Sequence, residues 1–242
     1  MKIRRRYLFL ILVGFIGACL VWWVLAAVRE PRNQSFYAWV NGNQATRSAL
    51  TIMNQEACPG FPFIVPAGGY IGLLYGDPRI PYSNRNPHQG IDIFSNSEPG
   101  LTPIYAAYDG YITREAAWKS TLIQRVPDDP LQPGRQIWLY YTHIADSQGN
   151  DFIEPAFPAG TSEFFVSQGT LLGYTGNYSG NPSRPVGIHL HFSIVLDDGN
   201  GHYRNELEIE NTLDPSAYLG LPVNYACAPP AINQCTANPV CP

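Results

Sequence analysis

From Cys58 to about residue 220, the chain consists of short apolar or alternating runs separated by Gly, Pro, Asn and Asp. The runs include GYIGLLYGDP, GIDIFSNSEPG, RQIWLYYTHIAD and GIHLHFSIVLDDGNG. The 242 residues contain 22 Gly and 22 Pro, which indicates many turns. Short strands with turn signals between them favour a mainly β domain over parallel βαβ units. We therefore predict one β domain over residues 58–220.

The N-terminal 28 residues differ from the rest of the chain. Residues 1–6, MKIRRR, carry four basic side chains, and the following 22 residues carry no charge. Such a run is long enough to span a bilayer as a helix, and preceding basic residues favour a cytoplasmic N-terminus. We predict a cytoplasmic basic segment (1–6) and a signal anchor (7–28) that crosses the cell membrane once as a helix. A stalk or short helix (29–57) and an extracytoplasmic domain are expected to follow.

Two other interpretations of the N-terminus remain open. They are a cleaved signal peptide and a lipoprotein signal, in which IGAC precedes a lipidated Cys19. Both predict that the apolar run ends near the cleavage point, whereas LVWWVLAAV continues beyond Cys19. The length of the run therefore favours an uncleaved anchor.

The charge of the exported part argues against one class of partner. Without the basic residues of MKIRRR, 11 of the 15 Lys and Arg remain against 19 Asp and Glu, which gives a formal charge near −8. Proteins hold phosphate backbones with Lys and Arg. Nucleic acid is therefore not an expected partner.

Four of the five cysteines, namely Cys58, Cys227, Cys235 and Cys241, lie in the exported part. In an oxidising compartment they predict two disulfides, with three possible pairings. A zinc knuckle is the rival interpretation of the last three, but they lack CxxC spacing and a nearby His. We expect residues 221–242 to form a Pro- and Cys-rich tail pinned to the domain, with Cys58 a plausible partner.

The five histidines include candidate ligands for a metal site. His189 and His191 form an HxH in a run that resembles a strand, so their side chains emerge on the same face. His88 and Asp92 flank Gly90, where glycine lets the backbone bend tightly. Two His and a carboxylate with an open fourth position are typical of a catalytic zinc, because the vacancy holds the water to be activated.

Each of these features also has an ordinary interpretation. A lone HxxxD is usually an accidental match in a surface loop, and HxH occurs on ordinary polar strand faces. His143 fits a strand-end histidine, and His202, in DDGNGHYRN, fits a hairpin turn. Four of the five histidines nevertheless fall into three local contexts that suit one site.

Four motifs resemble one protein family. HQGID, YTHIAD, VSQGTLLGYTGN and HLHF, in this order, are similar to the lysostaphin/LytM-type zinc endopeptidases, which cut peptide cross-links in bacterial cell walls. The resemblance covers roughly residues 60–197 and implies the duplicated hybrid motif fold, an antiparallel β-sheet core with an open groove. It also implies peptidoglycan peptides as substrate and one Zn²⁺ ion.

The resemblance carries roles for individual residues. It makes His88, Asp92 and His191 the zinc ligands and His143 and His189 the catalytic pair. Because a neutral imidazole can take a proton from zinc-bound water, we assign the general base to His189. His143 would hydrogen-bond the water or stabilise the oxyanion, depending on its protonation.

Other functions remain open at this point. A non-catalytic wall-binding or hydrolase-activating module of the same fold, or a regulatory protease with a protein substrate, would carry similar motifs. The stretch between Ile112 and His143 is longer and richer in Pro than the family pattern, so that side of the groove is expected to differ. Residues 29–57 or this insertion would be the candidates for covering a latent site. The sequence does not determine the oligomeric state.

Overall fold

The computed structural model describes residues 13–19, 21–22, 31–53, 56–79 and 81–242. The predicted cytoplasmic segment 1–6 and most of the predicted span 7–28 lie outside these residues. Residues 13–19 and 21–22 are helical. Among the described residues, no helix is long and apolar enough to cross a bilayer.

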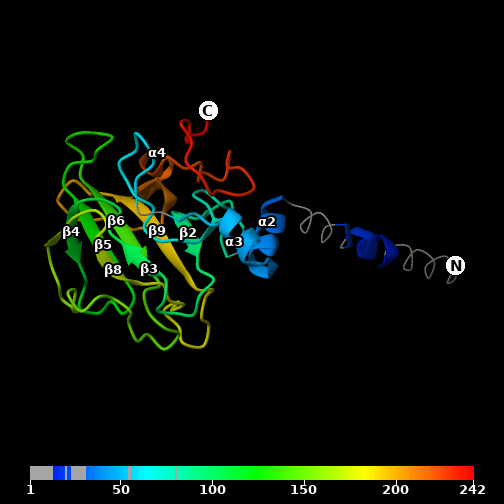
Figure 1. Cartoon of the computed structure of the whole chain (residues 1–242), viewed down its shortest axis with the longest axis horizontal. Helices are drawn as coiled ribbons and strands as arrows, with labels where there is room; N and C mark the ends of the chain where they lie inside the picture. The colour runs from blue at the N-terminus through cyan, green and yellow to red at the C-terminus, as the bar shows by residue number, and fades with distance from the viewer. Residues whose placement is uncertain (1–12, 20, 23–30, 54–55, 80) are drawn as a thin grey trace, which may run out of the picture.

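The domain is built on one large antiparallel sheet (Figure 1). Its strand order is β1 (Tyr70–Leu73), β2 (Ile91–Phe94), β9 (His189–Leu196), β6 (Ile137–Thr142), β5 (Leu122–Val126), β4 (Gly110–Thr113) and β7 (Phe164–Val166), and β10 (Thr212–Leu213) pairs with β9. A separate pair is formed by β3 (Pro103–Tyr105) and β8 (Leu171–Tyr174). The prediction of a mainly β fold with an antiparallel core is confirmed.

Strand β9 lies inside this sheet, between β2 and β6. Its sequence, HLHFSIVL, is rich in aromatic and β-branched residues, which suit a pleated, buried strand. Leu190, Phe192 and Ile194 are fully buried in the hydrophobic core. The alternate residues, beginning with His189 and His191, emerge on the opposite face because successive side chains of a strand alternate. One face of β9 therefore builds the main core. The other face carries His189, His191 and Ser193, and it ends in Val195, which packs with Ile123 and Trp138 in a second hydrophobic cluster.

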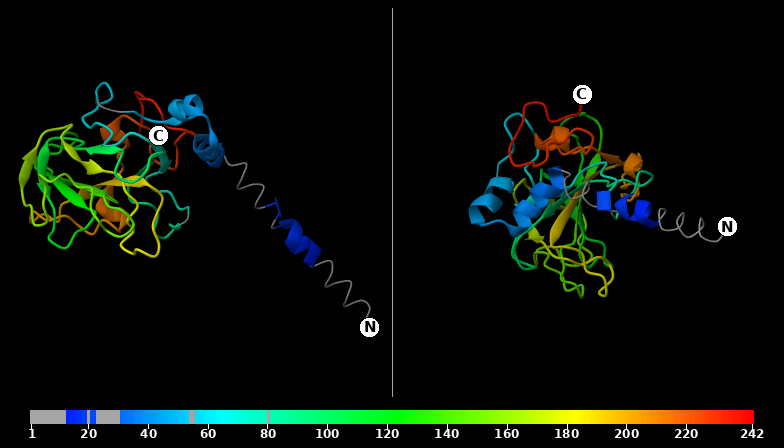
Figure 2. Two further views of the ribbon diagram at one scale, coloured as in Figure 1. Left: turned by 60° about the horizontal axis from the view of Figure 1, so that its bottom comes forward. Right: turned by 90° about the vertical axis from the view of Figure 1, so that its right-hand side faces the viewer.

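Residues expected as a stalk or short helix form two helices, α2 (Pro31–Asn41) and α3 (Gln44–Leu50). Asn43 caps α3 by accepting a hydrogen bond from the Thr46 amide at 3.0 Å. Both helices lie beside the β1–β2 edge of the sheet, as Figures 1 and 2 show. Trp39 of α2 is buried and stacks on Tyr70 of β1 with ring centroids 5.4 Å apart.

The C-terminal region packs around the same edge. After β9 follow the short helix η1 (Ile209–Asn211) and α4 (Ser216–Leu219). The guanidinium of Arg32 in α2 donates to the backbone oxygens of Tyr225 and Ala228 at 3.0 and 2.7 Å. The tail therefore holds the N-terminal helices against the domain.

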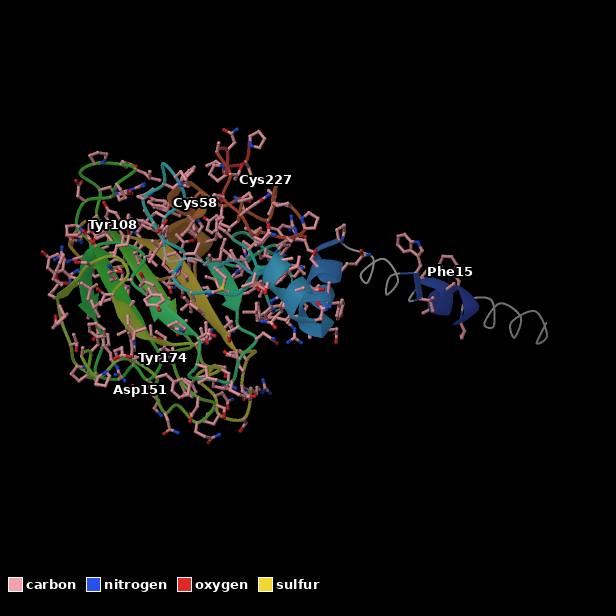
Figure 3. The ribbon with its side chains drawn as sticks, in the orientation of Figure 1. Phe15, Cys58, Tyr108, Asp151, Tyr174 and Cys227 are labelled. Atoms are coloured by element: carbon pink, nitrogen blue, oxygen red, sulfur yellow. A yellow bond between two sulfur atoms is a disulfide. The ribbon has the colours of Figure 1, made fainter. Side chains whose placement is uncertain are left out.

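Two disulfides are present, as predicted. Cys58 pairs with Cys235, and Cys227 pairs with Cys241. Figure 3 labels Cys58 and Cys227, one cysteine of each disulfide, and both lie on the side of the molecule that carries the tail. The first bond joins the beginning of the β domain to the tail, as expected for Cys58.

Two loops make up most of the stretch between Ile112 and His143, which is expected to make one side of the groove differ. The loop 114–121 lies at the His143 end of β6, where the Ile144 amide donates to Ser120 O at 2.9 Å. The loop 127–136 precedes β6, whereas His143 follows it, so the two lie at opposite ends of this six-residue strand. Buried Asp129 fixes the loop by accepting hydrogen bonds from Arg135 and from the hydroxyl of Tyr218 in α4. The loop 127–136 therefore lies at the end of β6 away from the histidine cluster.

Candidate functional site

Three neighbouring strands bring the candidate ligands together. In the β2–β9 register, Asp92 lies opposite His191. In the β6–β9 register, Thr142 lies opposite His191 from the other side, and His143 follows Thr142 directly. Residues that are far apart in the sequence therefore meet on one face of the sheet.

His88 reaches this cluster from the loop that precedes β2. Its backbone is fixed on both sides, because its amide donates to Asp77 O at 2.9 Å and its carbonyl accepts from the Gly76 amide at 2.8 Å. The ring Nδ1 donates to the backbone oxygen of Leu74 at 3.1 Å. The Nε2 atom is therefore directed at Asp92 and His191 with a free lone pair when the imidazole is neutral.

Gly90 is required for a reason that differs from the predicted tight bend. Its backbone does not adopt a positive φ. A Cβ atom at this position would instead lie 2.2 Å from the backbone oxygen of Phe192. Glycine therefore permits the close approach of the HQGID segment to β9 that puts His88 and Asp92 beside His191.

The three ligand atoms form a compact, buried group. His88 Nε2 lies 3.1 Å and His191 Nδ1 lies 2.9 Å from Asp92 Oδ1, and the two nitrogens are 2.9 Å apart. All three side chains are buried. Ligand atoms of a tetrahedral zinc with bonds of roughly 2.0–2.1 Å lie about 3.3 Å apart, so a small outward movement would fit this set to zinc.

The electrostatics of this group reflect its mixed charges. Burial raises the pKa of Asp92, but nearby His88 and His189 and a hydrogen bond from His191 outweigh burial and hold the pKa well below its usual range. Burial lowers the pKa of His191, but hydrogen bonds to Asp92 and Glu206 raise it to about 10. The carboxylate of Asp92 is therefore paired with a positive charge on His191. A metal cation bound at the site would replace that positive charge.

His143 and His189 lie side by side next to the candidate ligands. Their ring centroids are 4.4 Å apart, and His189 Nε2 lies 3.6 Å from Asp92 Oδ2. Each ring donates its Nδ1 hydrogen to a backbone oxygen at 2.6 Å, His143 to Tyr178 and His189 to Gly187. Both rings therefore present a bare Nε2 atom, which can accept a hydrogen bond or a proton.

Both imidazoles are held in the neutral form. Burial is the main cause that lowers the pKa of His143 to about 3, and neighbouring His189 lowers it further. Burial also lowers the pKa of His189, against the opposing effect of Asp92. His143 additionally adopts a left-handed backbone conformation with φ of 71°, which is uncommon for a residue with a side chain and is found at functional sites.

The fifth histidine lies outside the cluster. The side chain of His202 is 77% exposed and lies 3.8 Å from Asp198, in the turn after β9. This agrees with its interpretation as a turn residue.

Several neighbours of the site were not singled out by the sequence, among them Phe94 and Glu206. Phe94 stacks on His189 with ring centroids 4.9 Å apart, and Glu206 Oε1 lies 2.8 Å from His191 Nε2. The position of Phe94, two residues after Asp92 on the same strand, was a usable signal because i and i+2 share a face. Glu206 belongs to no motif, and nothing local in the sequence distinguishes it from Glu208 or Glu210.

No family model and no curated protein matches this chain. Solved structures do. They include Csd3 from Helicobacter pylori (18% identity over 66% of this chain and 33% of that one, TM-score 0.38). A protein assigned as a glycyl-glycine endopeptidase, LytM, from Ruminococcus gnavus is 23% identical over 57% of this chain and 48% of that one, with TM-score 0.37.

The catalytic domain of the prophage-encoded M23 protein EnpA from Enterococcus faecalis, in a mutant form, is 21% identical over 62% of this chain and 92% of that one, with TM-score 0.33. The chain thus spans less than half the length of the first two structures. Two of these structures are described as a LytM endopeptidase and as an M23 protein.

Proposed function

We propose that this chain is a membrane-anchored, extracytoplasmic zinc metalloendopeptidase that cleaves peptide cross-links or stem peptides of bacterial peptidoglycan. One observation carries the proposal. A buried His–Asp–His ligand group lies directly beside two neutral imidazoles that present bare Nε2 atoms. Ligands of this type with an open position, next to a base, are the requirements of metal-assisted peptide hydrolysis.

The residues that would hold zinc are His88 through Nε2, Asp92 through its carboxylate and His191 through Nδ1. A zinc ion bound there supplies Lewis acidity and lowers the pKa of a water molecule toward neutrality. The neutral tautomer of His88 is set by its hydrogen bond to Leu74 O, which leaves the ligand nitrogen free.

His189 is suited to the role of general base. Its bare Nε2 can take a proton from the attacking water and then give it to the leaving amine, because the same atom is donor once protonated. The imidazolium so formed would be stabilised by Asp92, whose Oδ2 lies 3.6 Å away. Its lowered pKa keeps the ring unprotonated and ready to accept at neutral pH.

His143 is best suited to hold the water by accepting a hydrogen bond. With its pKa lowered to about 3 and its Nδ1 hydrogen engaged by Tyr178 O, its Nε2 has no hydrogen to give to an oxyanion. Of the two roles that the sequence left open, the geometry therefore favours orientation of the nucleophile. A donor role would require prior proton transfer to Nε2.

The compartment is proposed from two features. The basic residues and the uncharged run of residues 7–28 fit an anchor with its C-terminal body outside the cytoplasm. The two disulfides fit the oxidising conditions found there.

The test uses the full chain, purified in detergent and loaded with zinc, on purified peptidoglycan, with mass spectrometry of the released peptides. We expect new peptide termini with the wild type and with His202→Ala, the exposed-histidine control, and none with His189→Ala or after chelation. Zinc retained by His189→Ala would separate loss of the base from loss of the metal.

Two outcomes would redirect the assignment. If the zinc-loaded wild type leaves peptidoglycan uncut but cleaves a co-purified envelope protein, the chain is a regulatory protease. If His189→Ala restores cell-wall function in a deletion strain as well as the wild type does, the chain is a non-catalytic module.

A further inference from the structure

We infer that Glu206 is a positioning residue that orients His191 for metal binding, an inference that rests on the proposed metal site. Glu206 Oε1 lies 2.8 Å from Nε2 of His191, whereas the other ring nitrogen, Nδ1, faces Asp92 and His88. The two nitrogens point away from each other across the ring. Glu206 therefore contacts His191 on the side opposite the ligand atom and lies outside the ligand group.

This contact selects the useful tautomer of His191. An ionised carboxylate can only accept hydrogen bonds, so its partner atom Nε2 must carry the hydrogen. In the neutral ring, Nδ1 then has its lone pair free for a metal ion. Carboxylates that accept from the second nitrogen of a ligand histidine fix the ring orientation and raise its basicity.

The contact is shielded from water on both sides. His191 is buried, and the Glu206 side chain is 11% exposed. His88 has a matching arrangement, since its Nδ1 donates to Leu74 O while Nε2 faces the cluster. Each imidazole in the ligand group thus has an outer acceptor, and for His191 that acceptor is charged.

The segment that carries Glu206 is tied to the first ligand motif. Gln89, which lies between His88 and Gly90, is buried and donates to the backbone oxygen of Leu207 at 2.9 Å. Asn205 accepts from the Leu207 amide at 3.2 Å and shapes the turn. The loop after β9 is therefore held where the carboxylate of Glu206 meets His191. Through this contact Gln89, a residue of HQGID, helps to fix the orientation of His191.

The test measures zinc affinity in the full chain by competition with a chelator of known affinity. We expect Glu206→Ala to weaken zinc binding by about 10- to 100-fold and Glu206→Gln, which can still accept through its amide oxygen, to weaken it less. Glu210→Ala removes the same charge from an exposed position nearby and should leave zinc affinity unchanged. Circular dichroism would check that each variant is folded, and Glu206→Gln carries the comparison if Glu206→Ala does not fold.

A second readout separates positioning from general stabilisation. In the zinc-loaded protein labelled with ¹⁵N-histidine, the hydrogen on His191 Nε2 should give a signal protected from solvent exchange. Glu206→Ala should remove this protection and leave the His88 Nδ1 hydrogen protected by Leu74 O. Unchanged zinc affinity and an unchanged His191 signal in Glu206→Ala would overturn the inference, whereas a wild type that binds no zinc would overturn the proposed metal site itself.

Discussion

Gly90 sets how closely the first ligand segment approaches strand β9. Gly90→Ala would place a Cβ atom 2.2 Å from Phe192 O, and the neighbour is backbone that cannot rotate away. We expect the free energy of unfolding to fall by about 1 to 3 kcal/mol, the usual cost of overpacking, with weakened zinc binding as β2 moves. Chemical denaturation measures the first effect and chelator competition the second.

Gly68→Ala is the matched control for this substitution. Its new methyl group would meet the sulfur of Met53 at 3.3 Å, and that side chain is 76% exposed and can move aside. The control should unfold as the wild type does. Equal stability of Gly90→Ala and the wild type would mean that the close approach at Phe192 is not required.

Asp197 gives a prediction about pH. Its carboxylate accepts hydrogen bonds from Gln136 Nε2 at 2.6 Å, Trp138 Nε1 at 2.9 Å and the Gly199 amide at 2.7 Å. Burial raises its pKa, but these hydrogen bonds outweigh burial, so the folded pKa lies below that of the unfolded chain. A depressed carboxyl pKa stabilises the fold above the unfolded value, near 3.9, and this contribution is lost as the pH falls through the folded value.

We therefore expect Asp197→Asn to lower the free energy of unfolding by about 1 to 2 kcal/mol at pH 7, since the carboxylate is partly solvated. The difference from the wild type should shrink steadily as the pH falls below about 4. Urea unfolding curves at a series of pH values measure it. A difference that stays constant down to pH 2 would show that the ionised form has no special role.

At the scale of secondary structure, the alternation of side chains on a strand made the site predictable. HLHF places His189 and His191 on one face whatever the rest of the fold does, and β9 has this arrangement. The local pairing of His88 with Asp92 was also readable, because both lie in one short segment. The three candidate ligand positions, His88, Asp92 and His191, could be named without knowledge of strand order.

Other parts of the structure depend on contacts that no local pattern encodes. The hydrogen bonds of Arg32 are made with residues 193 and 196 positions away, so the sequence could not place α2 on the domain. Glu206 meets His191 only because the loop after β9 folds back. The Pro-rich loop 127–136 is also held by a contact of this kind, between buried Asp129 and the hydroxyl of Tyr218 in α4.

The packing of α2 on the sheet gives a prediction at this scale. Trp39 is 4% exposed, stacks on Tyr70 and donates from Nε1 to the Thr51 hydroxyl at 3.0 Å. Trp39→Ala should lower the free energy of local opening of residues 31–50 by about 3 kcal/mol or more. Hydrogen exchange should become faster there and stay slow in β9.

Tyr37→Ala is the control, because Tyr37 is an aromatic residue of the same helix but is 53% exposed. It should leave the exchange pattern of the helices unchanged. If both variants behave alike, the attachment of α2 depends on the Arg32 contacts with the tail rather than on Trp39.

At the scale of the whole molecule, the two disulfides should differ in their effect on stability. Cys58 and Cys235 are separated by 177 positions, whereas Cys227 and Cys241 are separated by 14. In the chain-entropy account, a cross-link stabilises more when it closes a longer loop of the unfolded chain. Replacing Cys58 and Cys235 by Ser should therefore destabilise the domain by about 4 to 5 kcal/mol, against about 3 kcal/mol for the other pair.

Guanidinium unfolding of the two double variants under non-reducing conditions measures this difference. Cys19→Ser, which removes the unpaired and exposed cysteine, is the control for thiol chemistry. The order of the two effects also has a structural meaning. The long-range disulfide joins the start of the β domain to the tail that holds α2, so its loss should loosen both termini together. If the short-range pair proves the more important, the tail is stabilised mainly from within, and its attachment to the domain relies on packing around Cys58 rather than on the covalent bond.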